Sequence, residues 1–186
     1  MTSRQAALVT AFALLVATVS ILLLLARPRP PNKPAVTRAA APAATDLSRT
    51  IKARLFYVSD DGTRLTSVER DVPYAEGPEQ AREIINAQIA LGEPLVSAVP
   101  SGTALRAVYL TERGDAYVDL SRQAVTGHLG GTVNELLTVY TIVNALTVNL
   151  PAVKAVQILI DGKEVETLAG HVDLRQPLAK NMGLVQ

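Results

Sequence analysis

Residues 132–160 read TVNELLTVYTIVNALTVNLPAVKAVQILI and predict a helix followed directly by a buried strand. Apolar residues in the first part recur at helical spacing, which is typical of a helix that packs on a core. Leu150-Pro151 ends this pattern, because proline lacks the N–H that a further helical turn needs. From Val153 the segment is almost continuously apolar, as in a central strand covered on both faces.

The start of this helix carries the pattern of a capping box. Thr132 and Glu135 have the required spacing, so we expect the hydroxyl and the carboxylate to bind amides that the first turn leaves without partners. The predicted core stripe consists of Val133, Leu136, Leu137, Tyr140 and Val143.

A second apolar stripe, formed by Val139, Ile142 and Leu146, lies on the other side of the same helix. One interpretation is that this stripe packs on another helix, which suits Val139 and Leu146. Ile142 points almost directly away from the expected sheet, at a step of about 100° per residue. We therefore name Val139, Ile142 and Leu146 as a candidate interaction surface, since an exposed apolar patch marks a contact site.

The sequence before and after this segment predicts a second helix and several strands. Alternation of apolar and polar residues marks strands at 51–58, 68–72, 104–110, 116–120 and 164–168. Pro78 near the first helical position and Gly92 beyond the last delimit the other helix. This order favours an α+β fold in which two helices pack on one face of a mixed β-sheet.

The N-terminal part of the chain reads as a membrane segment followed by a tether. After a short tail at 1–5, residues 6–26 carry no charge and would span about 31 Å as a helix, close to the thickness of a bilayer core. A cleaved signal peptide is the alternative, but its apolar core would be shorter. Residues 27–49 are rich in Pro and Ala and predict a linker. The folded domain is expected at 50–175, with a C-terminal tail at 176–186.

Charge and cysteine content exclude several classes of function. The net charge of +1 hides a basic N-terminal part, because residues 1–49 hold six basic residues and one acidic residue. The remainder holds twelve basic and sixteen acidic residues and no Trp, which argues against a nucleic-acid partner. The absence of Cys excludes disulfides, thiolate catalysis and a lipid-bearing cysteine.

The two histidines, His128 and His171, do not form a metal-binding pattern, because they stand alone and lack helical spacing. The glycine-rich segment 127–131 precedes a helix N-terminus, where backbone amides could hold an anion. Glu135 in the first turn would repel such a ligand, so a structural cap is the preferred interpretation. No metal or cofactor site is predicted.

No catalytic centre is predicted either. Asp115 and Asp119 lie on one face of a strand, about 13 Å apart end to end, which exceeds the separation of about 9.5 Å that glycosidase carboxylates tolerate. Ser121 with Asp119 and His128 could form a nucleophile set, but no nucleophile elbow surrounds Ser121.

Four segments in order carry a resemblance to the GerMN domain family. They are Pro100–Leu105, Ala116–Ser121, Gly130–Leu136 and the block from Val143 through Leu150-Pro151 to Lys163. The resemblance covers roughly residues 51–174 and implies an envelope-facing α+β module, similar to ring-building motifs, with no known enzymatic activity. GerM-like proteins often carry a lipid-anchor cysteine and two tandem copies, whereas this chain has no Cys and one copy. The resemblance therefore does not by itself carry a sporulation role.

Two hypotheses of function follow. The first is a membrane-anchored, non-catalytic module of the bacterial envelope that binds another envelope protein or associates with itself. The alternative is a domain that binds or hydrolyses cell-wall polymers. The resemblance places the domain outside the cytoplasmic membrane, whereas Lys and Arg predominate on the C-terminal side of the span, which would place it in the cytoplasm. We follow the resemblance.

Overall fold

The computed structural model describes residues 46–90 and 94–186. The predicted membrane span at 6–26 and nearly all of the predicted linker lie outside these residues. Within the described residues, no helix combines the length and the apolarity that crossing a bilayer requires.

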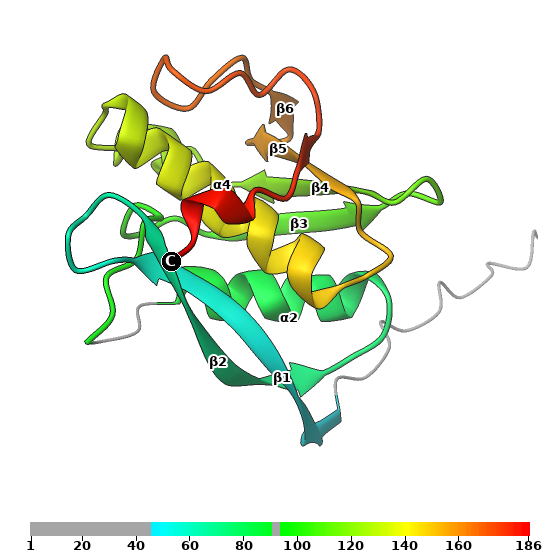
Figure 1. Cartoon of the computed structure of the whole chain (residues 1–186). Coiled ribbons are helices and arrows are strands. Elements are labelled where there is room, and N and C mark those ends of the chain that lie inside the picture. The colour runs from blue at the N-terminus through cyan, green and yellow to red at the C-terminus, as the bar shows by residue number, and fades with distance from the viewer. Residues whose placement is uncertain (1–45, 91–93) are drawn as a thin grey trace, which may run out of the picture. The chain divides into compact units, whose positions relative to one another are not determined.

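The strands form two separate sheets (Figure 1). The first is an antiparallel hairpin of β1 (Asp46–Val58) and β2 (Leu65–Tyr74). The second is mixed and contains β3 (Leu105–Leu110), β4 (Asp115–Leu120), β5 (Ala155–Ile160), β6 (Lys163–Glu164) and β7 (Leu178–Ala179). In it β4 and β5 are parallel, and the other pairs are antiparallel. The parallel pair requires a crossover connection, which the long helix between them supplies.

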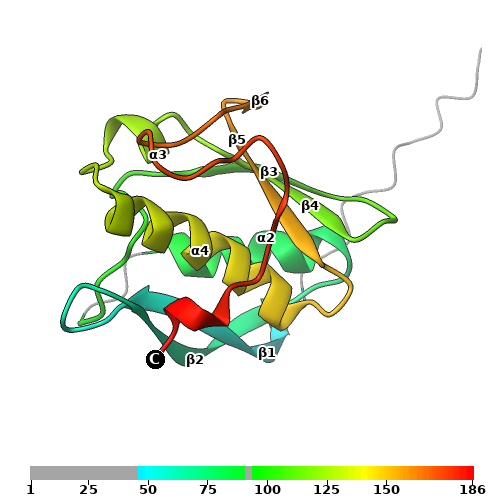
Figure 2. The ribbon, with the colours of Figure 1, turned by 45° about the horizontal axis from the view of Figure 1, so that its top comes forward.

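Two long helices, α2 (Pro78–Ile89) and α4 (Thr132–Asn149), lie between the two sheets (Figure 2). Helix α4 contacts β1 on one side and β5 on the other, while α2 contacts both hairpin strands and β3. A short helix α3 (Gln123–Thr126) and a 3-10 turn η1 (Met182–Leu184) complete the fold. The predicted α+β fold with a mixed sheet is confirmed, but the hairpin is a separate sheet that covers the second side of the helix layer.

This hairpin corrects the candidate interaction surface. Val139, Ile142 and Leu146 are all 0% exposed and belong to the hydrophobic core. Helix α4 is apolar on two sides because it has a sheet on each side, and a helix that is apolar all round is a buried one. The three residues therefore do not form an exposed surface in the folded domain.

The free edge of β1 is closed by amide side chains from both helices. Gln88 of α2 accepts the Phe56 N–H at 2.8 Å and donates to the Phe56 carbonyl at 2.7 Å. Asn149 of α4 makes the same pair with the main chain of Arg54, at 2.8 Å in each direction. The Val58 N–H then donates to the Val96 carbonyl at 2.9 Å. These groups occupy the edge where another strand would otherwise pair.

Replacing Gln88 with Met is expected to destabilise the fold by about 2–3 kcal/mol, because it leaves the buried N–H and carbonyl of Phe56 without partners. Methionine has a similar volume, so the loss would reflect hydrogen bonding rather than a cavity. Urea unfolding monitored by circular dichroism would measure the change. Asn86→Ala on the exposed face of α2 is the control, with an expected change within about 0.5 kcal/mol. Equal stability of the two variants would contradict the role of Gln88.

The C-terminal residues belong to the fold rather than to a tail. Strand β7 pairs with the start of β5, and the Gln186 N–H donates to the Leu65 carbonyl at 2.9 Å. The predicted strand at 164–168 is reduced to Lys163–Glu164, and the chain continues as a loop to β7. These differences arise because the C-terminal segment pairs with elements that are distant in sequence, which no local pattern reveals.

Candidate interaction surface

Three exposed aliphatic side chains of the described residues lie in or near the segments that lead into α4. Leu129 is 94% exposed, Val96 is 63% exposed and Val133, in the first turn of α4, is 48% exposed. Leu129 and Val96 both border a hollow of about 440 Å³. We call this hollow, together with its rim residues Val96 and Leu129, the Leu129 surface.

Three parts of the chain line the Leu129 surface. The loop at 96–101 and the loop at 127–129 form two walls, Val58 and Gly62 come from the end of the hairpin, and α4 supplies Asn134, Leu137 and Thr138. No Asp, Glu, Lys or Arg lies among the lining residues. Apart from His128, the lining therefore contains no acidic or basic side chain.

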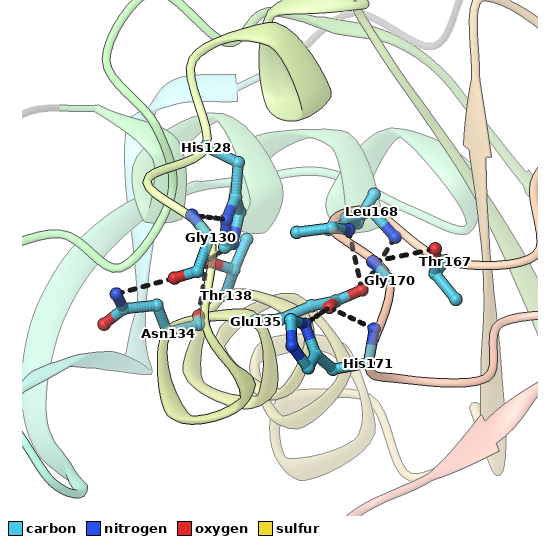
Figure 3. Close-up of polar contacts among 10 residues, drawn as sticks. His128, Gly130, Asn134, Glu135, Thr138, Thr167, Leu168, Gly170 and His171 are labelled. Atoms are coloured by element: carbon cyan, nitrogen blue, oxygen red, sulfur yellow. Dashed lines mark hydrogen bonds and ion pairs between the residues drawn. The ribbon is translucent and has the colours of Figure 1, made fainter.

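Hydrogen bonds around His128 hold the 127–131 loop in place (Figure 3). The Gly130 N–H donates to Nδ1 of His128 at 2.9 Å, and Nε2 lies 3.2 Å from Oγ1 of Thr138. Both ring nitrogens of His128 are therefore engaged, one with the loop itself and one with α4. Gly130 and Gly131 have φ values of +79° and +86°, a region that side-chain-bearing residues rarely adopt.

Glu135, in the first turn of α4, is 0% exposed and binds the loop that contains Leu168 and His171 (Figure 3). Its Oε1 accepts the N–H groups of Leu168 and Ala169 at 2.8 and 2.9 Å, and its Oε2 accepts the N–H of His171 at 2.8 Å. Nδ1 of His171 also lies 3.2 Å from Oε2. Glu135 thus holds the loop between β6 and β7.

These contacts correct the predicted capping box. Gly131 occupies the N-cap position and makes no side-chain cap, and Thr132 is exposed as the first helical residue. Glu135 faces inward to the distant loop instead of back to the start of its own helix. Thr132 and Glu135 have the spacing of a capping box, but the Glu135 carboxylate accepts three backbone N–H groups of the loop instead.

The loop amides also determine the pKa of Glu135. Burial raises the pKa, but backbone N–H donors from Ala169, His171, Leu168 and Val172 together outweigh it and hold the pKa below its ordinary value of 4.5. The carboxylate therefore stays ionised in the interior, where an unpaired charge would be costly.

This lowered pKa predicts a loss of stability in acid. The stabilisation from Glu135 is complete above the pKa of the unfolded chain and is lost as the pH falls through the lower pKa of the folded state. Urea unfolding of the natural domain and of Glu135→Gln, from about pH 6 to about pH 3, would measure it. We expect the stability difference between the two proteins to shrink as the pH falls. A difference that is independent of pH would contradict the assignment.

Of the two carboxylates considered for catalysis, Asp119 is engaged in structural bonds. Asp119 is 6% exposed; it accepts the Gly162 N–H at 2.7 Å and pairs with Nε of Arg106 at 3.2 Å. Asp115, at the other end of β4, is half-buried. Ser121 accepts the N–H of Ala104 at 3.0 Å, whereas His128 bonds to α4. The geometry brings none of these groups together as a nucleophile with its base.

The histidines are also used separately, because His128 bonds to Thr138 and His171 bonds to Glu135. Among residues 46–90 and 94–186, no group of three or more His, Asp or Glu side chains is placed to hold a metal ion.

Sequence reasoning missed the Leu129 surface. One signal was present: Leu129 is a large apolar residue between a histidine and two glycines, a loop context in which burial is not expected. Val96 carried no such signal, because it lies in an apolar stretch that resembles a core segment.

Comparison with known proteins gives one family and several structural relatives. The model of the family described as Germane, sporulation and spore germination, matches residues 54–166. A crystal structure of a candidate lipoprotein from Clostridium perfringens aligns with TM-score 0.51 and 22% identity, covering 75% of this chain and 93% of that chain. The first GerMN domain of the sporulation protein GerM from Bacillus subtilis aligns with TM-score 0.52 and 19% identity. This alignment covers 70% of the present chain and 98% of the GerM domain.

The tandem GerMN domains of the same Bacillus subtilis protein align with TM-score 0.53 and 16% identity. This alignment covers 70% of the present chain and 46% of the tandem structure, so the chain spans under half of that relative. At these identities the likenesses show the fold. No curated protein matches the chain in sequence.

Proposed function

The chain belongs to the Germane family of sporulation and spore germination domains, and from this premise we propose that it is a non-catalytic protein-interaction module of the bacterial cell envelope. The observation that carries the proposal is the Leu129 surface. Leu129 and Val96 are 94% and 63% exposed and border the same hollow, and exposed apolar residues that cluster in this way mark contact sites.

The polar groups of the hollow support binding rather than chemistry. His128 and Thr138 are bonded to Gly130 and to the Ala98 carbonyl, and Asn134 donates to the Gly130 carbonyl at 2.9 Å. A hydrolytic site would need a base aimed at a substrate, but these groups hold the loop. No observation on the described residues favours the alternative of cell-wall hydrolysis.

We also propose that residues 6–26 anchor the protein in the cytoplasmic membrane and that the domain lies on the outer side. The uncharged length of this segment supports the anchor, and membership of the family supports the orientation. The charge bias across the span opposes the orientation, but this bias has exceptions.

A reporter fusion tests the orientation. Alkaline phosphatase fused after Gln186 is expected to be active, because the enzyme folds only outside the cytoplasm. A fluorescent protein that matures only in the cytoplasm is expected to stay dark in the same position. Inactive phosphatase together with a fluorescent reporter would place the domain in the cytoplasm.

The interaction role can be tested by a photo-reactive amino acid at position 129 of the full chain, in native membranes. Light is expected to produce covalent adducts with protein at this position. Tyr109 on β3 is the matched control, because it is also exposed, at 60%, but lies outside the Leu129 surface. Equal labelling at both positions, or none at position 129, would refute an interaction role for this surface.

A further inference from the structure

Resting on the proposed function, we propose that a hollow at the C-terminal end of α4 binds an acidic segment of a partner protein. Its volume is about 650 Å³, within the range of about 300–1,000 Å³ that is usual for ligand pockets. Arg54, Lys154 and Lys180 line it, and all three are exposed. No Asp or Glu lies among its lining residues, so we call it the cationic hollow.

The three cations of the cationic hollow lack the contacts that engage most other basic side chains of the described residues. Ion pairs with carboxylates engage Lys52, Arg82, Arg106, Arg122 and Arg175. Arg49 and Arg70 lie over tyrosine rings. Within residues 46–90 and 94–186, the three cations of the hollow form neither kind of contact. Their charges are therefore available to a ligand.

Two of these cations face each other across the ends of neighbouring strands. Ala155 of β5 pairs with Ala179 of β7 in an antiparallel register. The next step in this register places Lys154 opposite Lys180. Opposite side chains in an antiparallel pair are close neighbours on one face of the sheet, and like charges there are destabilising. A negatively charged group between the two lysines would relieve this repulsion.

Nearby groups of the domain do not neutralise the hollow. The last turn of α4 lines part of it, and a helix C-terminus favours cations, but its dipole corresponds to only about half a negative charge. Glu69 lies opposite Arg54 and Asp115 lies opposite Ala155. Neither carboxylate lines the hollow or forms an ion pair with its cations. The remaining positive charge selects an anionic ligand.

The apolar part of the lining favours a protein segment among anionic ligands. Val148, Val153 and Met182 line the hollow beside the cations, and Met182 is 38% exposed. Covering this aliphatic surface stabilises a complex when the ligand also brings apolar groups. A segment in which acidic and aliphatic residues alternate brings both. A phosphate polymer, or the headgroups of a lipid bilayer, would present charge without apolar groups.

The cationic hollow is distinct from the Leu129 surface. The two share no lining residue. They lie at opposite ends of α4, whose 18 residues span about 27 Å. Each surface can therefore be tested without altering the other.

A binding experiment on the purified full-length chain tests the preference for acidic segments. The probe is a fluorescent peptide in which Glu alternates with Leu, and a peptide with Gln in place of each Glu is the control. We expect the Glu peptide to bind at least about ten-fold more tightly in anisotropy measurements, and added salt to weaken its binding. Equal affinity for the two peptides would overturn the proposal.

Matched charge reversals locate the binding site. Lys180→Glu is expected to weaken binding of the Glu peptide by at least about ten-fold. It is also expected to raise the midpoint of thermal unfolding, because attraction replaces repulsion opposite Lys154. Lys163→Glu makes the same change at an exposed position outside the hollow and is expected to alter the affinity by less than about two-fold. Equal weakening by both variants would indicate general surface charge and would overturn the site.

Phosphatidylglycerol vesicles are the second probe. If they bind the natural chain, if Lys180→Glu abolishes that binding, and if the chain does not prefer the Glu peptide, the hollow contacts a membrane surface and the proposal is wrong.

A photo-reactive amino acid at position 182 of the full chain, in native membranes, tests the partner itself. We expect adducts in which the linked partner segment is rich in Asp and Glu, and we expect Lys180→Glu to remove them. Adducts with neutral or basic segments, or adducts that persist in Lys180→Glu, would overturn the proposal. Adducts at position 129 with none at position 182 would overturn it while leaving the proposed function intact. The absence of adducts at both positions would overturn both.

Discussion

Replacing Ile142 with Asp is expected to destabilise the domain by more than about 4 kcal/mol, enough to unfold a protein of ordinary stability. Ile142 is 0% exposed in the middle of α4, between the two sheets. The substitution removes apolar contacts and places a carboxylate where no donor can compensate its lost hydration. Urea unfolding of a chain comprising residues 46–186 would measure the loss.

The matched control for Ile142→Asp is Leu129→Asp, which makes the same kind of change at a position that is 94% exposed. We expect this control to change the free energy of unfolding by no more than about 0.5 kcal/mol. If Ile142→Asp were equally mild, the hairpin would not cover α4 as described, and the second stripe of this helix would again be a candidate contact surface.

Replacing Glu135 with Ala is expected to cost about 3–5 kcal/mol, the range found when one partner of a buried charged network is removed. The N–H groups of Leu168, Ala169 and His171 would lose their acceptor, and the loop between β6 and β7 would lose its attachment to α4. Hydrogen exchange of this loop is expected to accelerate together with the drop in stability.

Two variants separate this role from simpler explanations. Glu164→Ala removes an exposed carboxylate at the end of β6, where the loop begins, and is expected to change stability by no more than about 0.5 kcal/mol. Thr132→Ala tests the capping box: a true N-cap residue would cost about 1 kcal/mol, and we expect less because Gly131 holds that position. A large effect of Thr132→Ala with a small effect of Glu135→Ala would restore the cap and contradict the loop anchor.

For the candidate site, the sequence predicted the glycine-rich loop and the helix that follows it, but not that they line an exposed apolar hollow. It pointed to segment 127–131 as a structural element, and the bonds of His128 to Gly130 and Thr138 agree with that. It could not show that Val96 and Leu129 border the same hollow. These residues are far apart in the chain, and their proximity depends on the hairpin end and on α4.

Elements that depend on neighbouring residues could be predicted from local sequence. Pro78 begins α2, Leu150-Pro151 follows the end of α4, and Asp161-Gly162 turns β5 into β6, with φ values of +50° and +76°. Each of these signals acts through backbone geometry within a few residues, so it survives in the isolated chain. The order of the elements was enough to favour the α+β class.

Which sheet covers which side of α4, and which groups pair in the interior, became known from the three-dimensional arrangement alone. The same apolar stripe of α4 would be a contact surface with one sheet present and is core with two. Local patterns predicted the strands of the hairpin, but not that they form a separate sheet on the other side of α4. Glu135 accepts hydrogen bonds from a loop more than thirty residues away in sequence. Gln88 bonds to the edge of β1, which is also more than thirty residues away. Burial and buried hydrogen bonds arise between segments distant in sequence, because each apolar face and each polar group takes the partner that folding brings to it.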